Sequence, residues 1–78
     1  MTTMAERHLA QAEQHLTTVD EGIARQRLLV AKLEMDGHNA GLAYALLAAI
    51  KETQRLVLAH RAMILDEIAA VRGKPPPP

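Results

Sequence analysis

The chain has 78 residues, enough for one small domain, and 49% of them are apolar, which excludes the composition of an intrinsically disordered protein. Nine basic and nine acidic residues cancel, which argues against a free-standing nucleic-acid binder or a membrane-surface helix. The absence of cysteine excludes disulfides and thiolate chemistry. Residues 1–8 contain no apolar core of a signal peptide, and no apolar run approaches the length of a transmembrane helix, so we expect a cytoplasmic protein.

The first predicted element is a long helix over about residues 4–35. Thr3 followed by Glu6 forms a capping-box pattern at its start. A seven-residue repeat then places one stripe of mostly apolar side chains on a single face. This stripe consists of Leu9, Ala12, Leu16, Val19, Ile23, Gln26, Val30 and Leu33.

A turn over residues 36–39 and a second helix over about residues 40–72 follow. Gly37 suits the left-handed residue that closes a helix, and Asn39 suits the N-cap of the next one. Gly73 can cap the second helix. Residues 74–78 contain four prolines, which predict a flexible polyproline tail. The tail is either a disordered helix stop or a ligand for an aromatic-lined groove.

The short turn makes the two helices antiparallel neighbours, so that residues 1–73 form one all-α helical hairpin. Apolar residues then face apolar residues in most layers. Leu9 is expected opposite Ile68, and Val19 opposite Val57. The polar Gln26 is expected opposite Ile50. This agreement between local pattern and pairing supports the hairpin.

The apolar surface is wider than one hairpin can bury, which predicts dimerisation into a four-helix bundle. The expected oligomer interface comprises Leu28, Leu29, Leu42, Leu46, Leu56, Leu58, Met63 and Leu65. The turn end carries a slight basic excess and the open end a slight acidic excess, which favours an antiparallel dimer.

The histidines are candidates for a metal site or a pH-sensitive group. His8 and His15 are two helical turns apart, too far for one ion, and the inward Glu-x-x-His pattern of bundle di-metal sites is missing. We therefore expect structural or solvent-facing histidines, no metal and no cofactor. A metal-binding bundle remains a third hypothesis. His60, if it lies in a partly buried layer, would make assembly pH-dependent.

Four polar residues interrupt the predicted helix seams. Either they form a buried ligand-binding network, or they penalise wrong alignments of the helices, and the second interpretation is favoured. They are Gln26, Thr53, Gln54 and Arg61.

The function is predicted from the motifs that the sequence contains and from those that it lacks. No nucleophile–base arrangement, phosphate-binding loop or pair of inward carboxylates is present, so we expect no enzyme. The leading prediction is a structural or protein-interaction module that acts as a homo-oligomer and engages another protein. The alternative is a small RNA- or DNA-binding regulator that uses Arg25, Arg27, Lys32, Lys51 and Arg55 near the turn.

Between Arg7 and Glu67 the chain resembles short helical-hairpin proteins of unknown function in alphaproteobacterial, especially rhizobial, genomes. That family often has Asp-Thr where this chain has Asn39-Ala40. The resemblance implies a bacterial cytoplasmic protein and carries no activity. The shared segments are Arg7-His8-Leu9, Arg25-Gln26-Arg27, Leu33-Glu34, Asp36-Gly37-His38, Leu46-Leu47, Glu52-Thr53-Gln54 and His60-Arg61 ahead of Leu65.

The architecture is also similar to that of the small plasmid RNA-binding hairpin that dimerises into a four-helix bundle. The RNA-facing surface of that family combines a basic helix face with an aromatic residue. This chain has no Phe, and its single aromatic residue is Tyr44. The similarity therefore supports the bundle more than it supports RNA binding.

Overall fold

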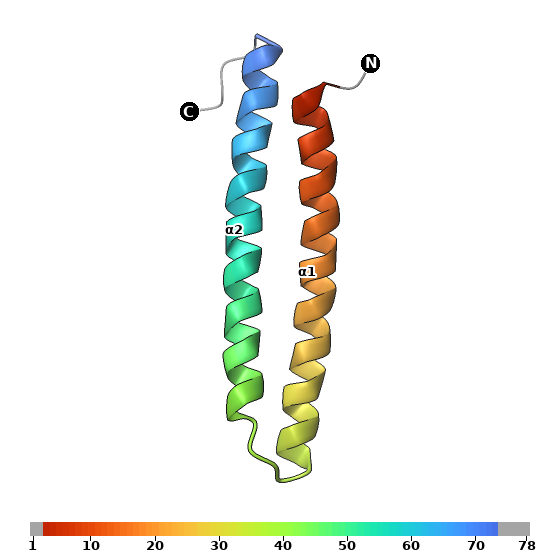
Figure 1. Ribbon diagram of the computed structural model, residues 1–78, viewed down its shortest axis with the longest axis vertical. Helices are drawn as coiled ribbons and strands as arrows, with labels where there is room; N and C mark the ends of the chain where they lie inside the picture. The colour runs from red at the N-terminus through yellow and green to blue at the C-terminus, as the bar shows by residue number, and fades with distance from the viewer. Residues whose placement is uncertain (1–2, 74–78) are drawn as a thin grey trace.

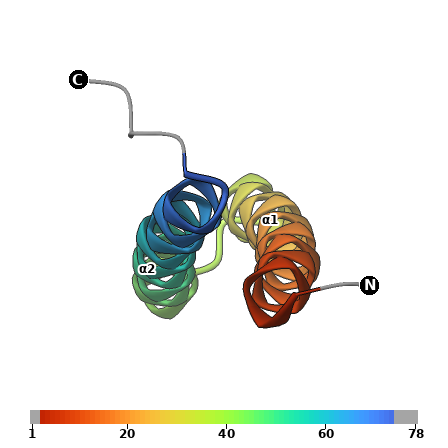
Figure 2. The same cartoon turned by 90° about the horizontal axis from the view of Figure 1, so that it is seen from above.

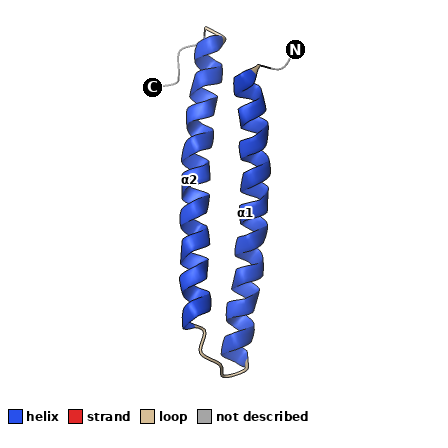
Figure 3. Cartoon of the chain, viewed as in Figure 1, coloured by secondary structure: helices blue, strands red, loops and turns tan. Residues whose placement is uncertain are grey.

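The computed structural model describes residues 3–73, which form two long helices joined by a short turn (Figure 1). Helix α1 spans Met4–Met35 and helix α2 spans Gly41–Val71. They run antiparallel and side by side, slightly inclined to each other in the end-on view (Figure 2). The described residues contain only helix and loop (Figure 3). The predicted all-α antiparallel hairpin is confirmed, while the predicted polyproline tail lies outside the described residues.

The start of α1 is fixed by Thr3, as the capping-box pattern predicted. Thr3 has extended backbone angles, and its Oγ1 accepts a hydrogen bond from the Glu6 backbone N–H over 3.1 Å. This bond satisfies one of the amide groups that lack partners in the first helical turn. The return contact differs from the standard box, because the Thr3 hydroxyl itself donates to Glu6 Oε1 over 3.2 Å.

The end of α1 is closed by Gly37 in the left-handed conformation, with a φ of 74°. The Gly37 N–H donates to the Glu34 carbonyl over 3.1 Å, and the His38 N–H donates to the Leu33 carbonyl over 2.9 Å. These two bonds define a Schellman motif, which satisfies carbonyls at the helix end. Gly73, with a φ of 72°, follows α2 in the same conformation. Both glycine predictions are therefore confirmed.

The start of α2 lies one residue later than the sequence predicted. Ala40 is the N-cap, and its carbonyl accepts the first helical hydrogen bond from Tyr44. The Asn39 side chain still supplies the capping chemistry, because its Oδ1 accepts a hydrogen bond from the Gly41 N–H over 2.8 Å. Asn39 therefore caps α2 from the position just before its N-cap.

The core is a single seam between the two helices. Its most buried side chain is Ile64, which is still 2% exposed. The radius of gyration is 17.4 Å, against about 12 Å for a compact domain of this length. The hairpin is therefore elongated and has a thin core. The buried residues are Ala12, Val19, Ile23, Gln26, Val30, Ala40, Ala43, Val57 and Ile64.

The position of Gln26 differs from its predicted pairing with Ile50. The Gln26 side chain reaches toward the turn, where its Nε2 donates to the Ala43 carbonyl over 2.9 Å. Ile50 instead lies beside Gly22, where a Cβ would come within 4.0 Å of Ile50 Cγ2. The Gln26 side chain therefore bonds the backbone of α2 nearer the turn, while Ile50 lies beside Gly22.

Candidate functional site

The polar residues predicted to interrupt the seam make separate contacts between the helices. Gln26 bonds Ala43, as described above, in the buried core. Gln54 Nε2 donates to Asp20 Oδ1 over 2.7 Å, and Arg61 pairs with Glu13 over 3.4 Å. Each bridge links α2 to α1 at a different level of the hairpin. Their separation supports alignment of the two helices rather than one shared ligand-binding network.

Thr53 does not belong to this group, although the sequence placed it in the seam. It is exposed, while the adjacent Gln54 is half-buried. The Thr53 hydroxyl donates to the Ala49 carbonyl one turn earlier in α2, over 3.2 Å. The prediction of Thr53 as a seam residue is therefore wrong, because α2 is rotated so that Gln54 faces α1.

One side of the hairpin carries a hydrogen bond near the turn. The Tyr44 hydroxyl donates to Glu34 Oε1 over 2.8 Å, linking the start of α2 to the end of α1. Because the neutral phenol is the donor, this bond raises the pKa of Tyr44, with a smaller contribution from partial desolvation. The Tyr44–Glu34 pair thus ties the two helices together at the turn.

The basic residues of the nucleic-acid alternative are all exposed, but Arg55 is already paired. Its guanidinium holds both carboxylate oxygens of Glu52, with a shortest distance of 2.6 Å. This hydrogen bonding lowers the pKa of Glu52 and raises that of Arg55. Helical geometry places Arg25 and Lys32 on the opposite side of α1 from Arg27. The basic residues therefore do not form one continuous stripe.

The apolar residues predicted for the oligomer interface are all exposed on the single hairpin. We define the leucine face as Leu29, Leu42, Leu46, Leu56 and Met63. Of these, Leu29, Leu42 and Leu46 line one shallow depression between the helices near the turn. The exposed fractions of the predicted residues are 72% for Leu28, 45% for Leu29, 86% for Leu42, 51% for Leu46, 55% for Leu56, 45% for Leu58, 63% for Met63 and 39% for Leu65.

The remaining predicted residues lie on other surfaces. Leu58 and Leu65 follow buried Val57 and Ile64 by one residue, so they project on the side of Tyr44, away from the leucine face. Leu28 lies on the outer surface of α1, on the side that is turned away from α2. The structure therefore places five of the predicted residues on one side of the hairpin and three outside it.

Four leucine-face residues belong to a second heptad pattern on α2, which was not recognised from the sequence. Its residues recur at alternating spacings of three and four, as in the seam of a coiled coil, but they are exposed. The signal was present in the sequence but overlapped with the stronger seam that faces α1. This second row consists of Leu42, Leu46, Ala49, Thr53, Leu56, His60, Met63 and Glu67.

Three histidines lie on the same side of the hairpin as the leucine face. His8, His15 and His60 line one shallow depression with Gln11 and Ala12. All three are exposed on the single hairpin, so His60 would be partly buried only in a layer that a partner helps to form. No cluster of three or more acidic, histidine or cysteine side chains suited to a metal was found within residues 3–73.

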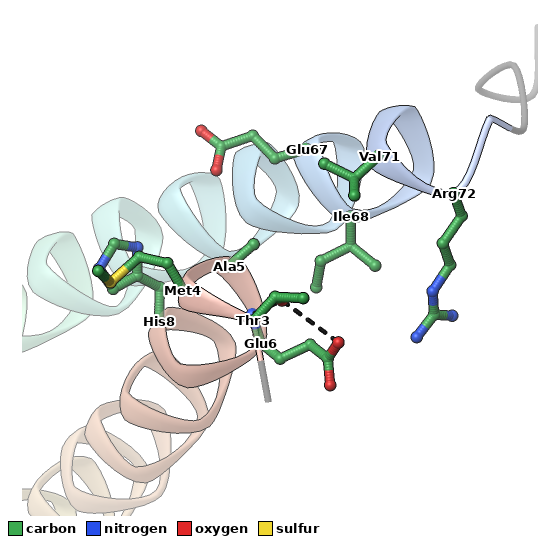
Figure 4. A pocket seen from close by; sticks show the side chains of 9 residues that line it. All are labelled: Thr3, Met4, Ala5, Glu6, His8, Glu67, Ile68, Val71 and Arg72. Carbon is green, nitrogen blue, oxygen red and sulfur yellow. Dashed lines mark hydrogen bonds between the residues drawn. The ribbon is translucent and has the colours of Figure 1, made fainter. Parts of the chain in front are cut away.

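A further depression lies at the open end, between the start of α1 and the end of α2 (Figure 4). Its lining combines the apolar Ala5, Ile68 and Val71 with charged residues at the margin. Glu67 and Arg72 point away from each other there (Figure 4). The charged groups thus do not converge on one point where a substrate could react.

Two further observations concern membrane spans and similarity to known proteins. Within residues 3–73, neither helix has an apolar stretch long enough to cross a membrane. Comparisons with protein-family models, with curated proteins and with solved structures found no match. The function is therefore argued from the geometry of the hairpin and its leucine face.

Proposed function

We propose that this protein is a non-enzymatic interaction module that works as a homodimeric four-helix bundle. The observation that carries the proposal is the exposed leucine face of a hairpin with a thin core. Two hairpins that stack through this face would convert one seam between two helices into a core between four helices. The outer surfaces of the bundle would remain free to engage another protein.

The magnitude of the exposed apolar surface supports association. The exposed parts of the five leucine-face side chains amount to about three whole side chains per copy, and burying each contributes about 1.5–3 kcal/mol. Two copies together therefore gain about 9–18 kcal/mol. The loss of translational and rotational freedom on association costs about 4–15 kcal/mol. The two ranges overlap, so complete burial of these side chains would be of the size needed to offset the cost of association.

The polar contacts of the hairpin leave this face available. Gln54 and Tyr44 bond Asp20 and Glu34 on the other side of the seam. The leucine face itself carries no interhelical ion pair among the described residues. An apolar face beside a polar one is the arrangement expected of a helix pair that packs against a partner on one side.

Light scattering at micromolar concentration tests the proposal. We expect a mass of twice the 8.5 kDa chain, and a monomer would overturn the proposal. The midpoint of thermal unfolding should also rise with protein concentration, because association stabilises only the folded hairpin. A midpoint independent of concentration would contradict a dimer in equilibrium with unfolded chains.

A matched pair of variants tests which surface associates. Leu56→Glu places a charge on the leucine face, whereas Leu28→Glu places the same charge on the outer surface of α1. Both side chains are more than half exposed, so each glutamate stays hydrated in a single hairpin. We expect Leu56→Glu to give monomers and Leu28→Glu to leave the dimer intact. The reverse result would show that another surface associates.

A further inference from the structure

The second row of α2 is suited to packing against its own copy. We infer that, in the dimer proposed above, α2 packs antiparallel against the α2 of the partner, with the two-fold axis passing beside Thr53. This inference rests on the proposed homodimer and adds its orientation and alignment. It follows from the order of large, small and polar residues along the row.

Thr53 lies at the middle of the row, where an isologous contact brings a residue against itself. A threonine hydroxyl in an apolar contact is costly unless it is hydrogen-bonded. Here the hydroxyl is already bonded to the Ala49 carbonyl over 3.2 Å. Thr53 therefore presents a satisfied hydroxyl and a methyl group, which suits a close contact between two copies at the axis.

The residues on either side of Thr53 are complementary in size when the second rows of two copies run in opposite directions. Ala49 is small and Leu56 is large, so each leucine of one copy fills the space left by the alanine of the other. Each of the two outer layers holds one leucine, opposite Met63 in one and His60 in the other. With the axis at Thr53, the layers pair Leu42 with the partner's Met63, Leu46 with the partner's His60, and Ala49 with the partner's Leu56.

The charged residue of the row falls outside these layers. Glu67 lies one turn beyond Met63, so in the antiparallel dimer it extends past the last apolar layer toward the partner's turn, where its carboxylate stays in water. Burying a carboxylate without a partner would be strongly unfavourable. The alignment on Thr53 therefore covers the apolar residues of the row, together with Thr53 and His60, and leaves the carboxylate of Glu67 exposed.

Charges beside the row favour the same orientation. Arg25 lies on this side of α1, in the half of the hairpin near the turn, while Glu67 lies in the other half. An antiparallel dimer brings the basic half of one copy over the half of the partner that carries Glu67. A parallel dimer would instead bring the Arg25 residues of both copies toward each other. Like charges facing each other disfavour that arrangement.

Single-cysteine crosslinking tests the alignment, because the wild-type chain has no cysteine. A disulfide requires Cα atoms about 4.4–6.8 Å apart, so only residues close to the axis join to themselves. We expect Thr53→Cys to form a covalent dimer under mild oxidation. Ala48→Cys, an exposed position on another side of α2, should stay uncrosslinked as the matched control.

Two further variants determine the direction of packing. Leu46→Cys should not crosslink to itself, but a mixture of Leu46→Cys and His60→Cys chains should form a mixed dimer. Efficient self-crosslinking of Leu46→Cys would show parallel packing and overturn the inference. A mixed disulfide between Thr53→Cys and Gly22→Cys chains, without self-crosslinking at Thr53, would overturn it in favour of α2 on the partner's α1.

Light scattering of the reduced variants separates this inference from the proposed dimer. If Thr53→Cys is a noncovalent dimer yet does not crosslink, the alignment is wrong and the homodimer stands. If both the wild-type chain and the reduced variant are monomers, the homodimer and the alignment fail together.

Discussion

The side-chain amide of Gln26 and the backbone carbonyl of Ala43 form a buried hydrogen bond of 2.9 Å between the two helices. It is the polar contact that lies deepest in the hairpin, since Gln26 is only 8% exposed. A buried amide must find a partner, and few alignments of α2 place a carbonyl within its reach. This bond therefore helps to define one relative position of the helices.

Replacing Gln26 with alanine should lower the free energy of unfolding by about 1–3 kcal/mol, because it removes this bond and its packing. Gln54→Ala is the matched control, since its bond to Asp20 is exposed to solvent. We expect the control to cost less than about 1 kcal/mol. Urea unfolding at one fixed protein concentration measures both values. An equal loss in the two variants would contradict the role assigned to burial.

Gly37→Ala should destabilise the hairpin at the turn. Alanine in the left-handed conformation costs roughly 1–2 kcal/mol, and the Schellman motif needs this conformation at residue 37. Gly37→Asn should lose less, because asparagine enters this region more easily. Thermal unfolding of both variants at equal concentration checks the order. A Gly37→Ala protein as stable as the wild type would show that the turn adopts another conformation.

Gly22→Ala should have the opposite effect. Gly22 lies inside α1, and a Cβ there would meet its nearest neighbours, Arg25 and Ile50, at the ordinary contact distances of 3.9 and 4.0 Å. Alanine therefore fits, and its higher helix propensity should raise the free energy of unfolding by about 1 kcal/mol. Circular dichroism during urea unfolding measures the change. A loss of stability would indicate that a second copy approaches α1 closely at this residue.

Ionisation of Tyr44 should weaken the hairpin at high pH. Its hydroxyl donates to Glu34, which raises the pKa of Tyr44 above the ordinary value of about 10. The folded state therefore holds this proton more tightly than the unfolded chain does. The stabilisation is complete below the unfolded pKa and disappears as pH rises through the folded pKa.

Ultraviolet absorbance gives a direct measurement, because Tyr44 is the only aromatic residue of the chain. The phenol of the wild type should titrate at a higher pH than that of Glu34→Gln, in which the carboxylate is missing. Lys51→Gln, which changes a charge elsewhere in α2, serves as the control and should stay closer to the wild type. Identical titrations of the wild type and Glu34→Gln would show that the bond does not persist in solution.

The secondary structure and the order of the elements could be predicted from the sequence. Thr3 and Gly37 act through backbone groups a few residues away, so their signals are readable without knowledge of the other helix. The heptad spacing of the first helix likewise identifies its buried face, because alternating spacings of three and four residues keep side chains on one side of a helix. Asn39 was misplaced by one residue because two successive positions can supply the same capping oxygen.

The candidate surface could be predicted only in part. The composition of α2 indicated too much apolar surface for one hairpin, and it led to the correct expectation that residues such as Leu42 and Leu56 are exposed on a single copy. It did not separate the leucine face from Leu58 and Leu65. That separation depends on which side of α2 is turned toward α1. Because α2 is apolar on more than one side, each of its apolar residues is a candidate for that contact.

The sequence by itself determined two helices, their turn at Gly37 and the seam of α1, because these follow from local hydrogen bonding and helical period. Only the tertiary structure decided that Gln54 faces α1 while its neighbour Thr53 faces outward, and that Gln26 bonds Ala43 rather than pairing with Ile50. The rotation and axial position of a helix are set by all of its packing contacts at once. No local segment of the sequence contains that information.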